Sequence, residues 1–164
     1  MKKAIYPGSF DPITNGHMDI LKRTLGLFDH VTLLLAVNPN KKSEFSVEER
    51  LALMKEATKD LENVDVDFTP GFTVDYAKKH GSSHIIRGLR AITDFEYEFQ
   101  LAAANSFLDN SVEMVFFMAS NKTSFISSST INEMSNNGAD VSKLVPPCVN
   151  LALLKKRESN NSLC

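Results

Sequence analysis

The feature that most constrains the fold is a regular alternation of short apolar runs with longer segments of helical periodicity. Residues 31–37 are almost continuously apolar, which is typical of a strand covered on both faces. Residues 14–28 instead carry apolar side chains three and four positions apart, as an amphipathic helix does. Strands separated by helices favour right-handed βαβ units, and therefore an open parallel sheet.

The same patterns predict the complete order of elements. The predicted strands are residues 4–6, 31–37, 64–68, 84–86 and 112–118. The predicted helices are residues 14–28, 46–60, 73–80, 93–108, 127–136 and 147–157, with capping-box spacing at Ser46/Glu49 and Thr93/Glu96. We therefore expect one Rossmann-like, doubly wound α/β domain with a five-stranded parallel sheet over residues 1–157, and a polar tail at residues 158–164.

Composition argues against several classes of protein. The net charge is −2 and charges of both signs are mixed along the chain, so no basic surface points to nucleic acid or membrane. The longest apolar runs, residues 31–37 and 114–119, are too short to span a bilayer. Cys148 and Cys164 have no metal-type or redox-type spacing and suit a reducing cytosol. We expect a cytoplasmic protein that binds any anionic ligand through a few local cations.

The turn after the first predicted strand is unusual. In open parallel sheets ligands bind at the carboxyl ends of the strands. Residues 6–17 contain no Walker A or Gly-x-Gly-x-x-Gly motif. They offer Gly8 for close backbone approach, the hydroxyl of Ser9, and Thr14 as an N-cap that places His17 where unpaired N–H groups attract anions. The alternative is that His17 is only a polar residue on a helix surface.

The turn after the fourth predicted strand carries two arginines. Arg87 and Arg90 bracket Gly88 and can direct two planar donor forks at phosphate oxygens. The alternative is a pair of surface salt bridges to Glu96 and Glu98.

Two further turns offer donors to an anion. Ser127, Ser128 and Ser129 open a predicted helix, either as anion donors or as a redundant N-cap. Lys41 and Lys42 follow the second predicted strand and would otherwise be solvated.

These motifs resemble those of a known family. Residues 7–12 followed by Thr14-Asn15-Gly16-His17 resemble the T/H-x-G-H signature of the nucleotidylyltransferase superfamily, and residues 126–129 resemble its second signature. The R-G-L-R segment at 87–90 followed by D-F-E-Y-E at 94–98 is similar to the bacterial phosphopantetheine adenylyltransferases. The resemblance runs from about residue 3 to about residue 155.

The resemblance implies transfer of AMP from ATP to 4'-phosphopantetheine, giving dephospho-CoA and pyrophosphate in coenzyme A synthesis, by a Mg²⁺-dependent homohexamer. It implies His17 as the catalytic residue. Because the sequence has no dense carboxylate cluster, we expect phosphates and water, and no protein side chain, to hold the metal. The ATP-binding residues that it implies are Ser9, Phe10, His17, Gly88, Leu89, Arg90, Glu98, Thr123, Ser124, Phe125, Ile126, Ser127, Ser128 and Ser129. The substrate-binding residues that it implies are Ser9, Lys41, Thr73 and Arg87.

The expected mechanism follows from charge, because the attacking phosphate is already anionic and needs no general base. His17, the helix start behind it, Lys41, Arg90 and Mg²⁺ are then expected to supply positive potential. Two rival hypotheses remain. One is a related enzyme that adenylylates nicotinamide mononucleotide or transfers CMP to a phosphorylated alcohol, which the R-G-L-R and D-F-E-Y-E pairing disfavours. The other is a non-catalytic nucleotide-binding sensor, which the intact His17, Arg90 and triple serine disfavour.

Overall fold

The computed structural model describes residues 1–38, 40, 42–120, 122 and 126–162, and at positions 92 and 93 it describes the backbone alone. The strands are β1 (Lys3–Gly8), β2 (His30–Ala36), β3 (Val64–Thr69), β4 (His84–Leu89) and β5 (Glu113–Met118). The helices are α1 (Asn15–Leu25), α2 (Val47–Thr58), α3 (Thr73–Lys79), α4 (Ile92–Leu108), α5 (Ser128–Asn136) and α6 (Pro147–Asn161).

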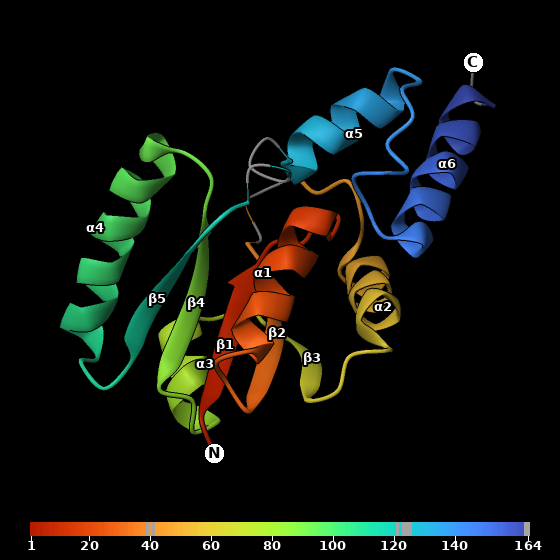
Figure 1. The fold of residues 1–164 in the computed structure, drawn as a ribbon. Coiled ribbons are helices and arrows are strands. Elements are labelled where there is room, and N and C mark those ends of the chain that lie inside the picture. The colour runs from red at the N-terminus through yellow and green to blue at the C-terminus, as the bar shows by residue number, and fades with distance from the viewer. Residues whose placement is uncertain (39, 41, 121, 123–125, 163–164) are drawn as a thin grey trace.

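The five strands form one parallel sheet, as the sequence predicted. Their order in the sheet is β3-β2-β1-β4-β5. The order reverses at β1, which pairs with β2 on one side and with β4 on the other. The carboxyl ends of the strands share the upper edge of the sheet in Figure 1, where α5 begins. That edge is where ligands bind in doubly wound folds.

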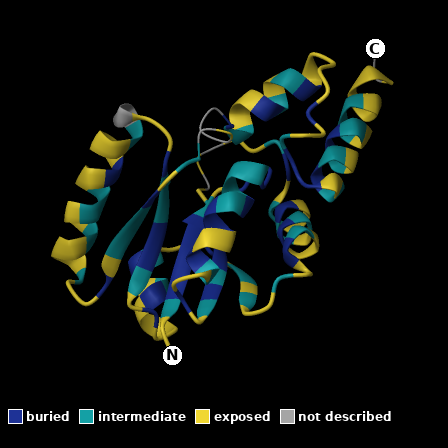
Figure 2. Cartoon of the chain, in the orientation of Figure 1, coloured by how far each residue is buried: buried dark blue, intermediate teal, exposed yellow. Residues whose placement is uncertain are grey.

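Both faces of the sheet are covered, which explains the continuously apolar strands. Ala4 and Tyr6 of β1 face the larger core, together with residues of α1, α2, α5 and α6. Ile5 faces the smaller core, which contains Val74 and Ala77 of α3. The buried residues therefore form two layers, one on each side of the strands (Figure 2).

One of the two predicted capping boxes is confirmed. Ser46 caps α2 and the carboxylate of Glu49 accepts a hydrogen bond from the Ser46 N–H. The other is wrong, because α4 begins at Ile92 and its N-cap, Ala91, makes no side-chain hydrogen bond. Position 93 therefore lies inside the first turn, where it cannot cap the helix.

The last helix ends later than predicted. α6 runs to Asn161, so the first part of the expected polar tail is helical. The hydroxyl of Ser159 donates to the Lys155 carbonyl and that of Ser162 to the Glu158 carbonyl, which satisfies backbone acceptors at this end. Within the described part of the chain, no helix is long and apolar enough to cross a membrane.

The turn after β1 depends on Gly8. Phe10 has a positive φ of 39° and its ring is 1% exposed. A Cβ atom on Gly8 would lie 2.9 Å from Cζ of that ring, which is closer than van der Waals contact. The fold therefore leaves no room for a side chain at position 8.

We expect Gly8→Ala to lower the free energy of unfolding by about 1–3 kcal/mol, the usual cost of overpacking a core. Urea denaturation measures this change. Gly71→Ala is the matched control, because the nearest atom to its added Cβ would be 3.7 Å away. Equal unfolding midpoints for the two variants would contradict the expectation.

Candidate active site

A cavity of about 630 Å³ opens at the carboxyl edge of the sheet. Its wall combines the turn after β1, the loop after β2, the end of β4 and the start of α5. The predicted site residues in this wall are Ser9, His17, Arg87, Gly88, Arg90, Glu98, Ile126, Ser127, Ser128 and Ser129. Segments distant in sequence are therefore brought to one place, as the prediction required.

Some predicted contacts are not found in this wall. The side chains of Phe10 and Leu89 are buried in the fold, at 1% and 7% exposure, and neither lines the cavity. Thr73 begins α3 and does not line it either. Lys41, Thr123, Ser124 and Phe125 lie outside the described residues.

His17 is fixed by a reciprocal capping box at the start of α1. The Thr14 hydroxyl accepts from the His17 backbone N–H at 3.3 Å, and the Thr14 N–H donates to His17 Nδ1 at 3.0 Å. Because Nδ1 accepts a hydrogen bond, the proton of the neutral imidazole is on Nε2. The rings of Phe10 and Tyr6 pack against it, with centroids 5.0 and 6.5 Å away.

The environment keeps His17 uncharged. Burial and, to a smaller extent, repulsion from Arg90 together lower the pKa of His17 from 6.5 to about 4. His17 is therefore a neutral N–H donor near pH 7. The expectation that it contributes positive charge is corrected, because a partly desolvated imidazole next to a guanidinium resists protonation.

Arg87 is oriented by a buried carboxylate. Its Nε and Nη2 donate to the two carboxylate oxygens of Glu98 at 2.7 and 2.6 Å, and Glu98 is 6% exposed. The predicted alternative named the right partner, but the pair is not a surface salt bridge. Nη1 makes no hydrogen bond to the described part of the chain, so this nitrogen is the one available to an anion.

Arg90 is held more loosely. Its Nε lies 3.3 Å from Asp94 Oδ2, and the two side chains are 44% and 28% exposed. The partner is Asp94, not Glu96 as the alternative proposed, since Asp94 also accepts the Arg90 backbone N–H at 3.0 Å. An ion pair so open to water is weak. Arg90 can therefore turn toward a bound phosphate.

The three serines at the start of α5 have different roles. Ser127 caps the helix by accepting the Thr130 N–H at 3.1 Å, which confirms the N-cap hypothesis for that residue. The Ser128 hydroxyl donates to the Pro12 carbonyl at 2.8 Å, so its proton is already used. Ser129 Oγ lies 3.2 Å from Ser127 Oγ. The helix start and the Ser129 hydroxyl remain the donors suited to an anion.

The wall also contains side chains that the sequence did not single out, among them Asp11, Arg50 and Asn132. Asp11 lies inside the first motif, so its position could have drawn attention. Arg50 has the sequence context of a surface charge on an amphipathic helix, yet it is only 5% exposed. Within the residues that the structure describes, no group of three His, Cys, Asp or Glu side chains could hold a metal ion.

Comparison with known proteins agrees with this architecture. Residues 5–134 match the profile of the family described as Cytidylyltransferase-like. A protein of Caldanaerobacter subterraneus subsp. tengcongensis named phosphopantetheine adenylyltransferase is 49% identical over 156 residues, which cover 95% of this chain and 98% of that protein.

Two crystal structures share the fold. One is a candidate nicotinate-nucleotide adenylyltransferase from Vibrio parahaemolyticus, with a TM-score of 0.74 and 21% identity, covering 96% of this chain and 97% of that one. The other is a lipopolysaccharide core biosynthesis protein from Thermoplasma volcanium, with a TM-score of 0.56 and 23% identity, covering 74% of this chain and 99% of that one. At these identities the likeness concerns the fold.

The chain belongs to the Cytidylyltransferase-like family. Its doubly wound sheet, with hydrogen-bond donors suited to phosphate at the carboxyl edge, agrees with this assignment. Within it, the chain groups with the phosphopantetheine adenylyltransferases, and the family predicted from the sequence motifs is confirmed.

The state of His17 can be measured directly. We expect long-range ¹H–¹⁵N spectra to show a proton on Nε2 at pH 7 and titration of His17 near pH 4. Because the unfolded chain protonates near the ordinary value of 6.5, stability associated with neutral His17 is lost as pH falls from 6.5 toward 4. His17→Gln, which cannot titrate, should remove this part of the pH dependence. Titration of His17 near 6.5 would contradict the account.

Proposed function

We propose that the protein is an adenylyltransferase that moves AMP from ATP to 4'-phosphopantetheine, giving dephospho-CoA and pyrophosphate. The observation that carries the proposal is the convergence of His17, Arg87, Arg90 and the start of α5 on one cavity. The 49% identity to a phosphopantetheine adenylyltransferase supports the same acceptor.

The reaction needs positioning and donors, and no general base. An oxygen of the acceptor phosphate forms a bond to the α-phosphorus of ATP, while the bond from that phosphorus to the bridging oxygen of pyrophosphate breaks. No proton has to be removed, since the attacking phosphate is already an anion. The Nε2–H of His17 and the N–H groups at the start of α5 suit the growing negative charge, and Nη1 of Arg87 suits the acceptor phosphate.

Mg²⁺ is proposed to arrive as part of the ATP complex. The described residues do not provide a carboxylate cluster for a resident ion. Two of the carboxylates in the wall are instead engaged with arginines, Glu98 with Arg87 and Asp94 with Arg90. Phosphate oxygens and water are the ligands that Mg²⁺ ordinarily keeps in such complexes.

A direct assay mixes the protein, ATP, Mg²⁺ and 4'-phosphopantetheine and detects dephospho-CoA and pyrophosphate. Nicotinamide mononucleotide replaces the acceptor in a parallel reaction, because the rival family activity would release pyrophosphate there. Binding of ATP without pyrophosphate release on either acceptor would favour the non-catalytic sensor.

We expect His17→Ala to lower kcat by at least about 10²–10³, the usual cost of removing one transition-state donor. His17→Gln is the matched variant, since its amide N–H can approach the place of Nε2–H, and it should retain more activity than the alanine variant. Thermal melting confirms that both variants fold. A folded His17→Ala protein with a near-normal rate would exclude His17 from catalysis.

We further propose that the protein works as a cytoplasmic homohexamer. α4 supports assembly, because Phe95, Tyr97, Phe99 and Phe107 are 49–90% exposed on one helix. Figure 2 shows exposed residues along the described part of α4. An aromatic surface of this kind is typical of an interface that another protein chain covers.

We expect light scattering to give about 109 kDa, six times the 18.2 kDa of one chain. Phe99→Glu should shift the mass toward smaller species, because it places a charge in the proposed interface. Leu151→Glu is the control, since Leu151 is 59% exposed on α6, on the opposite side of the molecule (Figure 1). A monomeric unmodified protein, or equal effects of both substitutions, would contradict the hexamer.

A further inference from the structure

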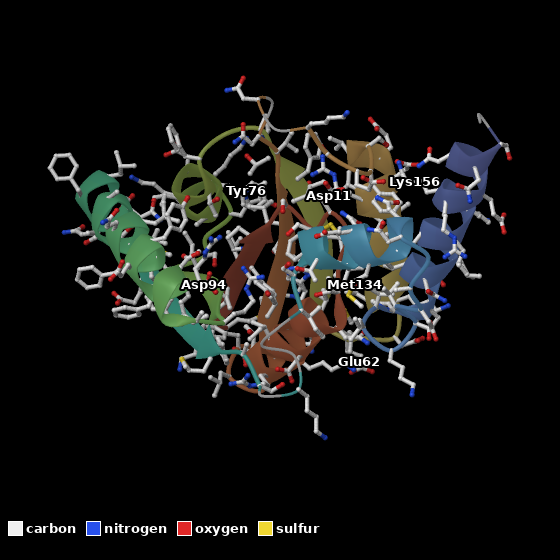
Figure 3. The ribbon with its side chains drawn as sticks, turned by 90° about the horizontal axis from the view of Figure 1, so that it is seen from above. Asp11, Glu62, Tyr76, Asp94, Met134 and Lys156 are labelled. Atoms are coloured by element: carbon white, nitrogen blue, oxygen red, sulfur yellow. The ribbon has the colours of Figure 1, made fainter. Side chains whose placement is uncertain are left out.

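The turn after β1 is held from two directions by bonds that the proposed reaction does not use. The Asp11 carboxylate accepts the backbone N–H groups of Glu44 and Phe45, both at 2.8 Å. From the other direction, the Asn132 side-chain amide on α5 donates to the Asp11 carbonyl at 2.9 Å. Figure 3, which looks down on the carboxyl edge, shows Asp11 beside α5. Asp11 thus joins the loop after β2 to the helix that begins with the serines.

These carboxylate bonds are long-range contacts, since their partners are 33 and 34 residues away in sequence. Hydrogen bonds to a charged acceptor are about twice as strong as those between neutral groups. The loop that they hold also carries Lys42 and Ser43, two residues of the cavity wall. The position of Asp11 therefore sets the position of this part of the wall.

Arg50 forms hydrogen bonds to both the turn after β1 and the loop after β2. Its Nη1 donates to the Ser9 carbonyl at 3.1 Å, and its Nη2 to the Ser43 hydroxyl at 3.4 Å. Among the described residues no carboxylate forms an ion pair with this 5% exposed guanidinium. Burying an unpaired cation is costly. Its donors are nevertheless directed at the junction between the turn after β1 and the loop after β2.

We propose that Asp11 is a positioning residue for the acceptor side of the site. It holds the loop that carries Lys42 against the turn that carries Ser9, so that the acceptor phosphate and the nucleotide bind at a fixed separation. This inference rests on the proposed function. A lysine ammonium is a compact charge on a flexible stem, so its backbone must be placed well for it to bind one phosphate. A misplacement of about 1 Å can cost about 10²-fold in rate.

The test compares Asp11→Asn with Glu49→Gln. Asparagine keeps the size of the side chain but turns an NH₂ group toward one of the two N–H donors. Glu49→Gln is the matched control, because Glu49 accepts the Ser46 N–H at 2.7 Å, one residue beyond Phe45, and does not line the cavity. A role in local folding alone would affect both variants alike.

We expect Asp11→Asn to raise the KM for phosphopantetheine and to lower kcat/KM for it by up to about 10²-fold. The Kd for ATP, measured by calorimetry, should stay unchanged in the same variant. Glu49→Gln should change neither constant. Unchanged acceptor constants in a folded Asp11→Asn protein, or equal weakening of ATP and acceptor, would overturn the proposal.

Hydrogen exchange provides a readout that does not depend on activity. The amides of Glu44 and Phe45 should exchange faster in Asp11→Asn and at the unmodified rate in Glu49→Gln. If the unmodified protein makes no dephospho-CoA, the proposed function fails. Independently of that result, unchanged exchange at these two amides would refute the proposal that Asp11 holds the loop in place. If Asp11→Asn does not fold, Asp11→Glu keeps both acceptor oxygens one methylene further out and should raise the acceptor KM. An unmodified KM in Asp11→Glu would then refute the positioning role.

Discussion

The unequal pairing of β1 with its two neighbours creates the space in which the site lies. β1 pairs with β2 over six positions, from Lys3 to Gly8, but with β4 only at Ala4 and Ile5. Beyond Ile5 the two central strands separate at the point where the strand order reverses. The cavity opens there, with Tyr6 of β1 and Gly88 of β4 in its wall. A continuous ladder would have closed this gap.

The site depends on the direction of its donors more than on net charge. Among the residues that the structure describes, the charged side chains of the wall are four cations and four carboxylates: Lys42, Arg50, Arg87 and Arg90, and Asp11, Glu44, Asp94 and Glu98. Such a wall has little net field, in keeping with the overall charge of −2. Three of these four carboxylates have a bonded partner in the structure: Glu98 and Asp94 each pair with an arginine, and Asp11 accepts two backbone N–H groups of the loop after β2. Pre-oriented N–H groups are effective where water is excluded, since they need no reorganisation during the reaction.

The sequence predicted the secondary structure and the motif residues. It missed the contacts and burial that arise only from tertiary packing. The buried strands were evident from their apolar runs, and His17 from its place one turn into the helix after β1. The bidentate bond between Glu98 and Arg87 was only an alternative, because the sequence does not show that Glu98 is buried. The bonds of Asp11 to Glu44 and Phe45 span more than thirty residues and leave no periodic signal. The neutral state of His17 likewise depends on burial, which tertiary packing determines.

The most direct test is a crystal structure with a non-hydrolysable ATP analogue and Mg²⁺. We expect the triphosphate in the cavity at the carboxyl edge, with one phosphate oxygen within hydrogen-bond distance of His17 Nε2 and another at the N–H groups that begin α5. A triphosphate bound at the opposite edge of the sheet, in the groove lined by His30, Asp65 and Tyr76, would contradict it.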